Sequence, residues 1–493
     1  MKKILIANRG EIALRIMRSA REMGIATVAV FSEVDRNALH VRYADEAVCI
    51  GAAPSAQSYL LGDKIIELCK KMNVDGIHPG YGFLSENATF ARKVKEAGLI
   101  FIGPSPESMD MMGDKLAAKQ TALKSKVPMV PGIDKAITDV AEAKKIAAQI
   151  GFPVLIKASA GGGGKGMREV QNEAEFESQM QRAVSEAKAA FGNGAVFLEK
   201  LIIAPRHIEI QVLGDQHGNV VYLFERECSI QRRHQKLVEE APSAILTPEL
   251  RKKMGESAVA LAKGCNYYSA GTLEFLVDKN LNYYFLEMNT RLQVEHPVTE
   301  LITGLDLVKE QIKIARGEKL SFTQDDLVIK GHAMELRVCA EDPANDFLPD
   351  TGTLTGYKIP QGPGVRVDGG FEAGMAIPVF YDSMIAKLIT YGKDRNEAIE
   401  RMRRAIEEYD IAGIQTTLSF GKWIMEHPKF ISAEIDTGFI GRYFKPEYLN
   451  TANSDLEEIA ALVAAYSIEN KTSMSNQSTE IPSKWRLRNQ YDD

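Results

Sequence analysis

The N-terminal part of the chain alternates short apolar runs with one amphipathic stretch. Lys2–Ala7 and Ala26–Phe31 have the pattern of strands, and Ile12–Met23 between them has helical spacing. A further apolar run at Leu99–Ile102 precedes a Gly-Pro-Ser-Pro break. This βαβ order predicts a doubly wound parallel sheet that ends near Gly113. The turn Asn8–Glu11 lacks the G-x-G-x-x-G spacing, so dinucleotide binding is disfavoured.

The next segment predicts a helix, a buried strand and a glycine-rich loop. Lys115 opens a helix, and Thr138 caps another that Gly151 ends. The strand Pro153–Lys157 leads into ASAGGGGKGM at 158–167, whose backbone N–H groups can close over anions. The spacing differs from a Walker A loop, and a flexible hairpin tip is the alternative. Because a lysine in an apolar strand needs an anionic partner, we favour the anion-binding interpretation.

Two later strands carry carboxylates. In extended conformation, alternate residues of Leu286–Glu300 share one face, and Gly271–Val277 places Glu274 between apolar neighbours. A single strand with this alternation would more often belong to a sheet with one charged, solvent-exposed face. Two of them, separated by a short turn and both bearing glutamate, favour a Mg²⁺ site of hard oxygen ligands. The residues on the shared face are Glu287, Asn289, Arg291, Gln293 and Glu295.

A charge run lies between two apolar strands. His207–Val212 alternates like a strand, although His207 alone would more often be structural. Glu225–Glu240 contains Arg226, Arg232, Arg233, His234 and Lys236. Such runs are usually solvated faces, but the position of this one favours an anion-facing loop.

The C-terminal part is rich in strands punctuated by glycine and proline. From Ile329 the pattern predicts a mixed α+β domain with antiparallel hairpins, and Arg395–Asp410 predicts an amphipathic helix. The compact part is expected to end near Phe444. Beyond it, Asp455–Asn470 predicts one more helix, and the polar end of the chain has the composition of a mobile segment.

Composition excludes several classes of function. The hydrophobic content of 45% is ordinary for a globular protein. A length of 493 residues suggests about three domains. A net charge of -6 gives no electrostatic reason for nucleic-acid or anionic-membrane binding. The five cysteines are scattered without a C-x-x-C pair, as expected for reduced thiols in a cytoplasmic protein. The sequence predicts neither a signal peptide nor a membrane span.

Together, the glycine-rich loop, Lys115, Lys157 and the Glu274/Glu287 pair describe a nucleotide–Mg²⁺ site without a P-loop. This pattern resembles the ATP-grasp superfamily. Six motifs in order closely resemble biotin carboxylase: ANRGEIALR, IHPGYGFLSEN, KASAGGGGKGM, ECSIQRRHQK, GTLEF and EMNTRLQVEHPVTE. The resemblance implies a Rossmann-like domain at 1–113, an ATP-grasp domain at 114–330 with a lid at about 131–203, and a C-terminal domain at 331–445.

The resemblance also implies roles for individual residues. Mg²⁺ or Mn²⁺ would be held by Glu274, Glu287 and Asn289, and bicarbonate by Lys236, Arg291, Gln293 and Val294. Glu295 would be the base, Arg337 would stabilise the biotin enolate, and Tyr81 would lie near the ureido ring; Lys236, Arg291, Glu295 and Arg337 form the implied catalytic set. ATP would be surrounded by Lys115, Lys157, Gly163, Gly164, Lys165, Gly166, Met167, Glu199, Lys200, Leu201, Ile202, His207, His234, Glu274, Leu276 and Glu287.

The segment 446–493, here called the C-terminal tail, extends beyond the stand-alone bacterial subunits that the core resembles. It is somewhat similar to the α subunits of propionyl- and methylcrotonyl-CoA carboxylases, which favours an acyl-CoA acceptor larger than acetyl-CoA. Because the chain contains no Met-Lys-Met biotinylation signal, biotin would arrive on a separate carrier protein. The resemblance further implies a carboxyltransferase partner and a homodimer. Two alternatives remain: another ATP-grasp carboxylate–amine ligase, and a silent ATP-binding scaffold.

Overall fold

The computed structural model describes residues 1–133, 137–158, 167–192, 194–449, 459 and 461–466. The chain divides into two units, Met1–Phe444 and Lys445–Asp493. The second unit contains a short helical turn at Pro446–Leu449 and helical residues at 461–466. The rest of the predicted helix at Asp455–Asn470, apart from residue 459, lies outside the described residues.

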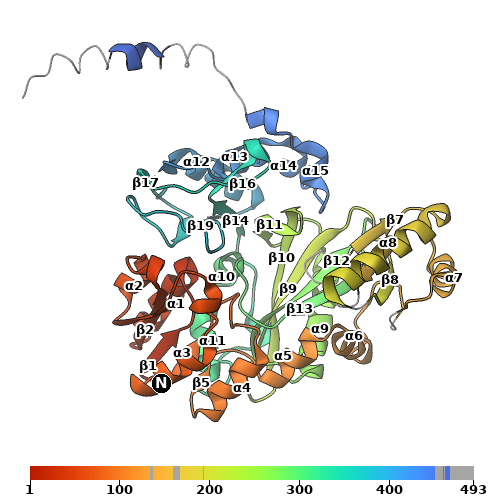
Figure 1. Ribbon diagram of the computed structural model, residues 1–493, viewed down its shortest axis with the longest axis horizontal. Helices are drawn as coiled ribbons and strands as arrows, with labels where there is room; N and C mark the ends of the chain where they lie inside the picture. The colour runs from red at the N-terminus through yellow and green to blue at the C-terminus, as the bar shows by residue number, and fades with distance from the viewer. Residues whose placement is uncertain (134–136, 159–166, 193, 450–458, 460, 467–493) are drawn as a thin grey trace, which may run out of the picture. The chain divides into compact units, whose positions relative to one another are not determined.

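The first unit opens with a five-stranded parallel sheet in the order β3-β2-β1-β4-β5. Figure 1 labels β1, β2 and β5 of this sheet. Alternation in β1 sends Ile4 and Ile6 to one face, where they pack with α1, and Leu5 to the other face, where it packs with Ile65 of α3. Helices therefore cover both faces, and the predicted doubly wound sheet is confirmed. The elements are β1 (Lys3–Ile6), α1 (Gly10–Glu22), β2 (Ala26–Ser32), α2 (Leu39–Tyr43), β3 (Glu46–Gly51), α3 (Gly62–Lys71), β4 (Gly76–His78), α4 (Ala88–Glu96), β5 (Ile100–Phe101), α5 (Pro106–Gly113) and α6 (Lys115–Lys124).

A small three-stranded antiparallel sheet in the order β7-β6-β8 has a hydrophobic core of its own. Gly151, with φ of +81°, ends α7 as predicted, but Asp139 rather than Thr138 caps the start of that helix. The side chain of Asp139 accepts a hydrogen bond from the Glu142 amide, three residues on, as an N-cap requires. The elements are α7 (Val140–Ile150), β6 (Val154–Ala158), β7 (Met167–Val170), α8 (Glu173–Phe191) and β8 (Val196–Lys200).

An antiparallel sheet of eight strands, in the order β13-β12-β9-β10-β11-β14-β19-β18, carries most of the chemistry. Strands β14, β18 and β19 come from the C-terminal part, so one continuous sheet joins residues on both sides of position 330. The strands are β9 (Arg206–Gly214), β10 (Val220–Arg232), β11 (Gln235–Ala241), β12 (Ser269–Val277), β13 (Tyr283–Asn289), β14 (His332–Cys339), β18 (Val365–Gly369) and β19 (Met384–Gly392).

Helices and short strand pairs complete the first unit. The predicted amphipathic helix is α12, whose Ile399, Met402 and Ile406 pack with Leu388 of β19 in one core. The α/β and α+β character expected from the sequence is thus confirmed. None of the described helices combines the length and apolar character that a membrane span needs. The remaining elements are α9 (Pro248–Gly264), α10 (His296–Thr303), α11 (Leu307–Ala315), β15 (Glu341–Asp342), β16 (Leu348–Pro349), β17 (Gly356–Lys358), α12 (Arg395–Glu408), β20 (Asp410–Ala412), α13 (Leu418–Glu426), α14 (Pro428–Ile431) and α15 (Phe439–Tyr443).

Candidate active site

The charge run Glu225–Glu240 forms the hairpin of β10 and β11, which corrects the prediction of a loop. The turn at Arg233 and His234 is exposed, but Arg226 is wholly buried. A buried guanidinium is stable only with partners. Arg226 donates to Glu209 on β9, to Gln211 at 2.7 Å, to Thr299 at 2.8 Å and to Thr272 at 3.0 Å. The charge of Arg226 thus pairs across strands, whereas Arg233 and His234 at the turn face solvent.

Lys236 is the centre of the site. Its ammonium donates to Glu209 at 2.6 Å, to Glu274 at 2.9 Å and to Glu295 at 2.7 Å. Burial alone would lower the pKa of Lys236, but these carboxylates raise it well above its ordinary value. The lysine is therefore a fixed cation that joins β9, β12 and the start of α10.

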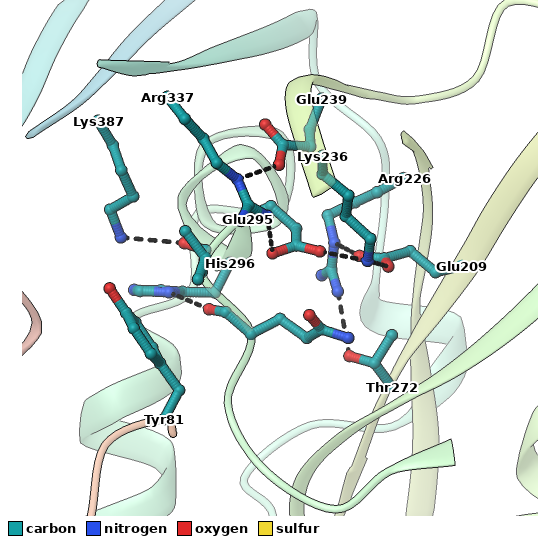
Figure 2. Close-up of polar contacts among 12 residues, drawn as sticks. Tyr81, Glu209, Arg226, Lys236, Glu239, Thr272, Glu295, His296, Arg337 and Lys387 are labelled. Atoms are coloured by element: carbon teal, nitrogen blue, oxygen red, sulfur yellow. Dashed lines mark hydrogen bonds and ion pairs between the residues drawn. The ribbon is translucent and has the colours of Figure 1, made fainter. Parts of the chain in front are cut away.

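Glu295 lies between two cations, as Figure 2 shows. It is the residue before α10, and its carboxylate also accepts from Nη2 of Arg337 at 3.1 Å. Burial would raise the pKa of Glu295, but Lys236 and Arg337 hold it well below its usual range. Arg337 also donates from Nε to Glu239 of β11 at 2.6 Å, so this guanidinium bridges two buried carboxylates.

The predicted extended stretch Leu286–Glu300 is correct only as far as Asn289, where β13 ends. The chain then leaves the sheet. Leu292 is buried in the core that also contains residues of α1 and α11, and a helix with Pro297 in its first turn follows. Gln293 still reaches Glu274 at 3.2 Å. Arg291 instead donates to Glu86 at 3.0 Å and to Asn289 at 3.2 Å.

The predicted metal ligands lie on neighbouring strands. Glu274 and Glu287 are directly opposite in the β12–β13 ladder, and Asn289 donates to Glu274 at 3.0 Å. Glu287 is open to solvent within the site, yet partial desolvation, followed by the charge of Glu274, raises its pKa. Two adjacent carboxylates and an amide oxygen form a donor set that suits Mg²⁺. A second close group joins His207, Glu209 and Glu274, with 3.1 Å between His207 Nε2 and Glu274 Oε2.

The nucleotide side contains a lysine cluster. Lys157 and Lys119 both donate to Glu199, whose pKa burial would raise but these lysines lower. Burial, with Lys157 nearby, lowers the pKa of Lys115. Lys200 contacts the carbonyl oxygens of Gly151 and Phe152, each at 2.8 Å.

The other predicted nucleotide contacts that the structure describes lie on strands or directly after them. Met167 pairs with Lys157 at the start of β7, Leu201 and Ile202 follow β8, and Leu276 pairs with His207 between β12 and β9. Gly163, Gly164, Lys165 and Gly166 lie outside the described residues.

Tyr81 lies in a hydrogen-bonded turn beside the site (Figure 2). Its hydroxyl donates to Glu11, and Asn8 donates to the carbonyl oxygens of Pro79 and Tyr81, each at 2.7 Å. A side chain at Gly80, where φ is +65°, would approach Asn8 Nδ2 to 2.9 Å. Glycine is required there because any β carbon would displace the asparagine that holds the turn.

Lys387 is a site residue that the sequence analysis missed. It is 0% exposed, donates to the Val294 carbonyl oxygen at 2.9 Å, and lies 3.2 Å from Glu11 and 3.9 Å from Asp368. Its position in an apolar strand is the same signal that identified Lys157. Other missed residues are Lys119, one helical turn after Lys115; Glu209, on the same strand face as His207; and Glu239, Glu11 and Glu86, whose partners are distant in sequence.

We expect Lys387→Met to lower the free energy of unfolding by about 3–5 kcal/mol, because it leaves Glu11 and Asp368 buried with one cation fewer. Urea denaturation followed by circular dichroism measures this change. Lys393→Met, at an exposed lysine just after the same strand, is the control and should leave the midpoint in place. Identical denaturation curves for Lys387→Met and the wild type would show that the ammonium has no structural role.

Comparisons with known proteins cover nearly all of the first unit. Three family descriptions match: "Biotin carboxylase, N-terminal domain" over residues 1–109, "Carbamoyl-phosphate synthase L chain, ATP binding domain" over 114–323, and "Biotin carboxylase C-terminal domain" over 335–442. The chain is 56% identical over 438 residues to the biotin carboxylase of Nostoc sp., covering 89% of this chain and 98% of that protein. It is 52% identical over 444 residues to biotin carboxylase 1 of Bacillus subtilis, covering 90% of this chain and 99% of that protein.

Solved structures agree with the sequence matches. The biotin carboxylase domain dimer of Hydrogenobacter thermophilus 2-oxoglutarate carboxylase was crystallised with MgADP, ADP and bicarbonate. It superposes with a TM-score of 0.86 at 49% identity, covering 92% of this chain and 99% of that one.

Proposed function

Because this chain belongs to the biotin carboxylase family of ATP-dependent ligases, we propose that it uses ATP, Mg²⁺ and bicarbonate to carboxylate biotin on a separate carrier protein. The observation that carries this proposal is the chain of contacts Glu274–Lys236–Glu295–Arg337, which joins the predicted metal, bicarbonate and biotin residues. We also propose the three-part division at 1–113, 114–330 and 331–445, followed by the C-terminal tail.

ATP would lie among the lysine cluster of Lys115, Lys119 and Lys157, with Leu276 against the adenine. Glu274, Glu287 and Asn289 would hold Mg²⁺ or Mn²⁺, which neutralises charge on the transferred phosphoryl group. The position of Glu274 directly opposite Glu287 in the β12–β13 ladder supports this assignment, because a cation would relieve the repulsion between the two carboxylates.

Bicarbonate would bind at Lys236, Arg291, Gln293 and the backbone of Val294. Lys236 and Arg337 hold Glu295 ionised, and a base with such a low pKa is weak. Once the bicarbonate anion shares these cations, less positive charge acts on Glu295, and burial raises its pKa. Glu295 can then take the bicarbonate proton.

The deprotonated bicarbonate oxygen would bond to the γ-phosphorus as ADP leaves, giving carboxyphosphate. Breaking the bond between its carbon and the bridging oxygen yields carbon dioxide and phosphate. Phosphate would take the proton from the ureido nitrogen of biotin, near Tyr81, and that nitrogen then bonds to carbon dioxide. Arg337 would stabilise the enolate oxygen that forms in between.

ADP release by the purified protein with MgATP tests the proposal when bicarbonate and free biotin are each added or omitted. Turnover should require bicarbonate and rise strongly with biotin. Turnover that ignores biotin but responds to an amine would identify another carboxylate–amine ligase. No ADP release, even with a biotinylated carrier present, would favour the scaffold.

We propose that the partners are a biotin carboxyl carrier protein and a carboxyltransferase subunit, and that the chain forms a homodimer. Deletion of Asp455–Asp493 within the C-terminal tail is expected to spare biotin carboxylation, because every site residue named above precedes the tail, but to weaken assembly with those partners. Co-purification with tagged partner subunits measures the assembly. A truncated chain that recovers the whole complex unchanged would exclude a docking role for the tail.

A further inference from the structure

Two buried glutamates face each other behind Arg337. Glu239 on β11 and Glu335 on β14 are directly opposite in the ladder, and both are 0% exposed. Side chains opposite each other on neighbouring strands lie within about 5 Å at their β carbons, and like charges there repel. Glu335 and Arg337 are two residues apart on β14, so both glutamates share a face with the guanidinium.

The hydrogen bonds of the pair are incomplete. Glu239 Oε1 accepts from Arg337, but within the described residues Glu239 Oε2 and both oxygens of Glu335 have no hydrogen-bond partner. A buried carboxylate anion without a donor is costly. A protonated carboxyl group opposite Glu239 would supply the missing donor.

The surrounding charges also leave Glu335 without a cation of its own. Besides Glu239, the groups that face it are Lys387 on β19, Arg337 on its own strand and Glu295 before α10. Arg337 is already shared by Glu239 and Glu295, and Lys387 lies beside Glu11 and Asp368.

The direction of the pKa shifts agrees with this geometry. Burial raises the pKa of Glu335 well above its ordinary value despite Lys387. Burial, with Glu295 nearby, raises the pKa of Glu239 to about 7 despite Arg337. Adjacent buried carboxylates titrate as a unit and retain one proton between them.

We propose that Glu335 carries a proton at neutral pH and donates it to Glu239 Oε2, which fixes Glu239 as the anionic partner of Arg337. Glu335 is then a positioning residue, because it acts on biotin only through Glu239 and Arg337. The catalytic consequence rests on the proposed function, whereas the shared proton does not. When the pair loses that proton, repulsion separates the glutamates and Arg337 loses its support.

The pH dependence follows from this arrangement. Below the apparent pKa of the pair, the carboxyl group of Glu335 is protonated and donates to Glu239, and Glu239 in turn holds Arg337 in position. As pH rises through that value, the wild-type rate of biotin carboxylation should fall, while bicarbonate-dependent ADP release without biotin should not.

Two substitutions at Glu335 separate positioning from folding. Glu335→Gln keeps an N–H donor that does not ionise, so its rate at neutral pH should stay close to wild type and its alkaline decline should disappear. Glu335→Leu removes the donor and should lower the biotin-dependent kcat by roughly 10- to 100-fold, with an unchanged KM for ATP. Glu310→Gln, at a buried carboxylate paired with Lys313 on α11, is the control and should keep the wild-type pH profile.

Infrared spectroscopy tests the proton without any activity. In difference spectra against the wild type, Glu335→Gln should lose one carbonyl stretch of a protonated carboxyl group, whereas Glu310→Gln should retain that band. The same band in Glu335→Gln, or a Gln variant that retains the alkaline decline, would overturn the proposal. Because the infrared reading needs no turnover, it distinguishes a wrong proton assignment from a wrong reaction.

Discussion

Replacing Glu295 by glutamine should lower bicarbonate-dependent ATP turnover by about 100-fold or more, the usual contribution of a general base. Glutamine has the same shape and can still accept from Lys236 or Arg337, but it cannot take a proton. Lys236 keeps Glu209 and Glu274 as partners, so the site should remain assembled. Steady-state ADP release measures the rate, and nucleotide titration should show unchanged affinity for ATP.

Glu310→Gln serves as the control for removing a buried carboxylate outside the site. Its turnover should match the wild type. If Glu295→Gln turns over normally with bicarbonate, Glu295 is not the base and another group must remove the proton.

Replacing Arg337 by lysine should lower biotin-stimulated turnover by about 100- to 1,000-fold, the range for loss of an oxyanion donor. The guanidinium spans Glu239 through Nε and Glu295 through Nη2, and a single ammonium cannot reproduce that fork. ADP release with bicarbonate alone should persist, because Lys236 still holds Glu295. The ratio of rates with and without biotin therefore measures the role of Arg337.

Arg395→Lys is a matched control, because Arg395 also binds a buried carboxylate, Glu240, but lies outside the site. It should keep the biotin stimulation. Equal losses with and without biotin in Arg337→Lys would assign this arginine to the bicarbonate step or to folding.

Sequence patterns correctly predicted the helices, strands and hairpin that are determined by residues close together in the chain. Apolar runs identified β1, β2 and β6, and the start of α6 at Lys115 was correct because Asp114 caps it locally. The two carboxylates of the β12–β13 hairpin were also predicted, since a short turn fixes their register.

The rest depended on contacts that a local pattern does not contain. The charge run around Arg226 resembled a loop because its partners come from β9, β12 and α10. The alternation at Arg291 and Gln293 continued past the end of β13, where the chain leaves the sheet and Leu292 enters the core that contains residues of α1 and α11. Glu239 and Glu335 meet through the β11–β14 register, which joins segments far apart in the chain.

The most direct test of the proposed reaction follows an oxygen atom from bicarbonate. If bicarbonate attacks the γ-phosphorus, ¹⁸O-labelled bicarbonate in a short incubation should transfer one labelled oxygen to phosphate per ADP released. We expect this transfer in the wild type at a rate equal to ADP release. Phosphate that carries no label, released together with ADP, would show that water attacks instead and would contradict the assignment of the Lys236–Glu295 site to bicarbonate.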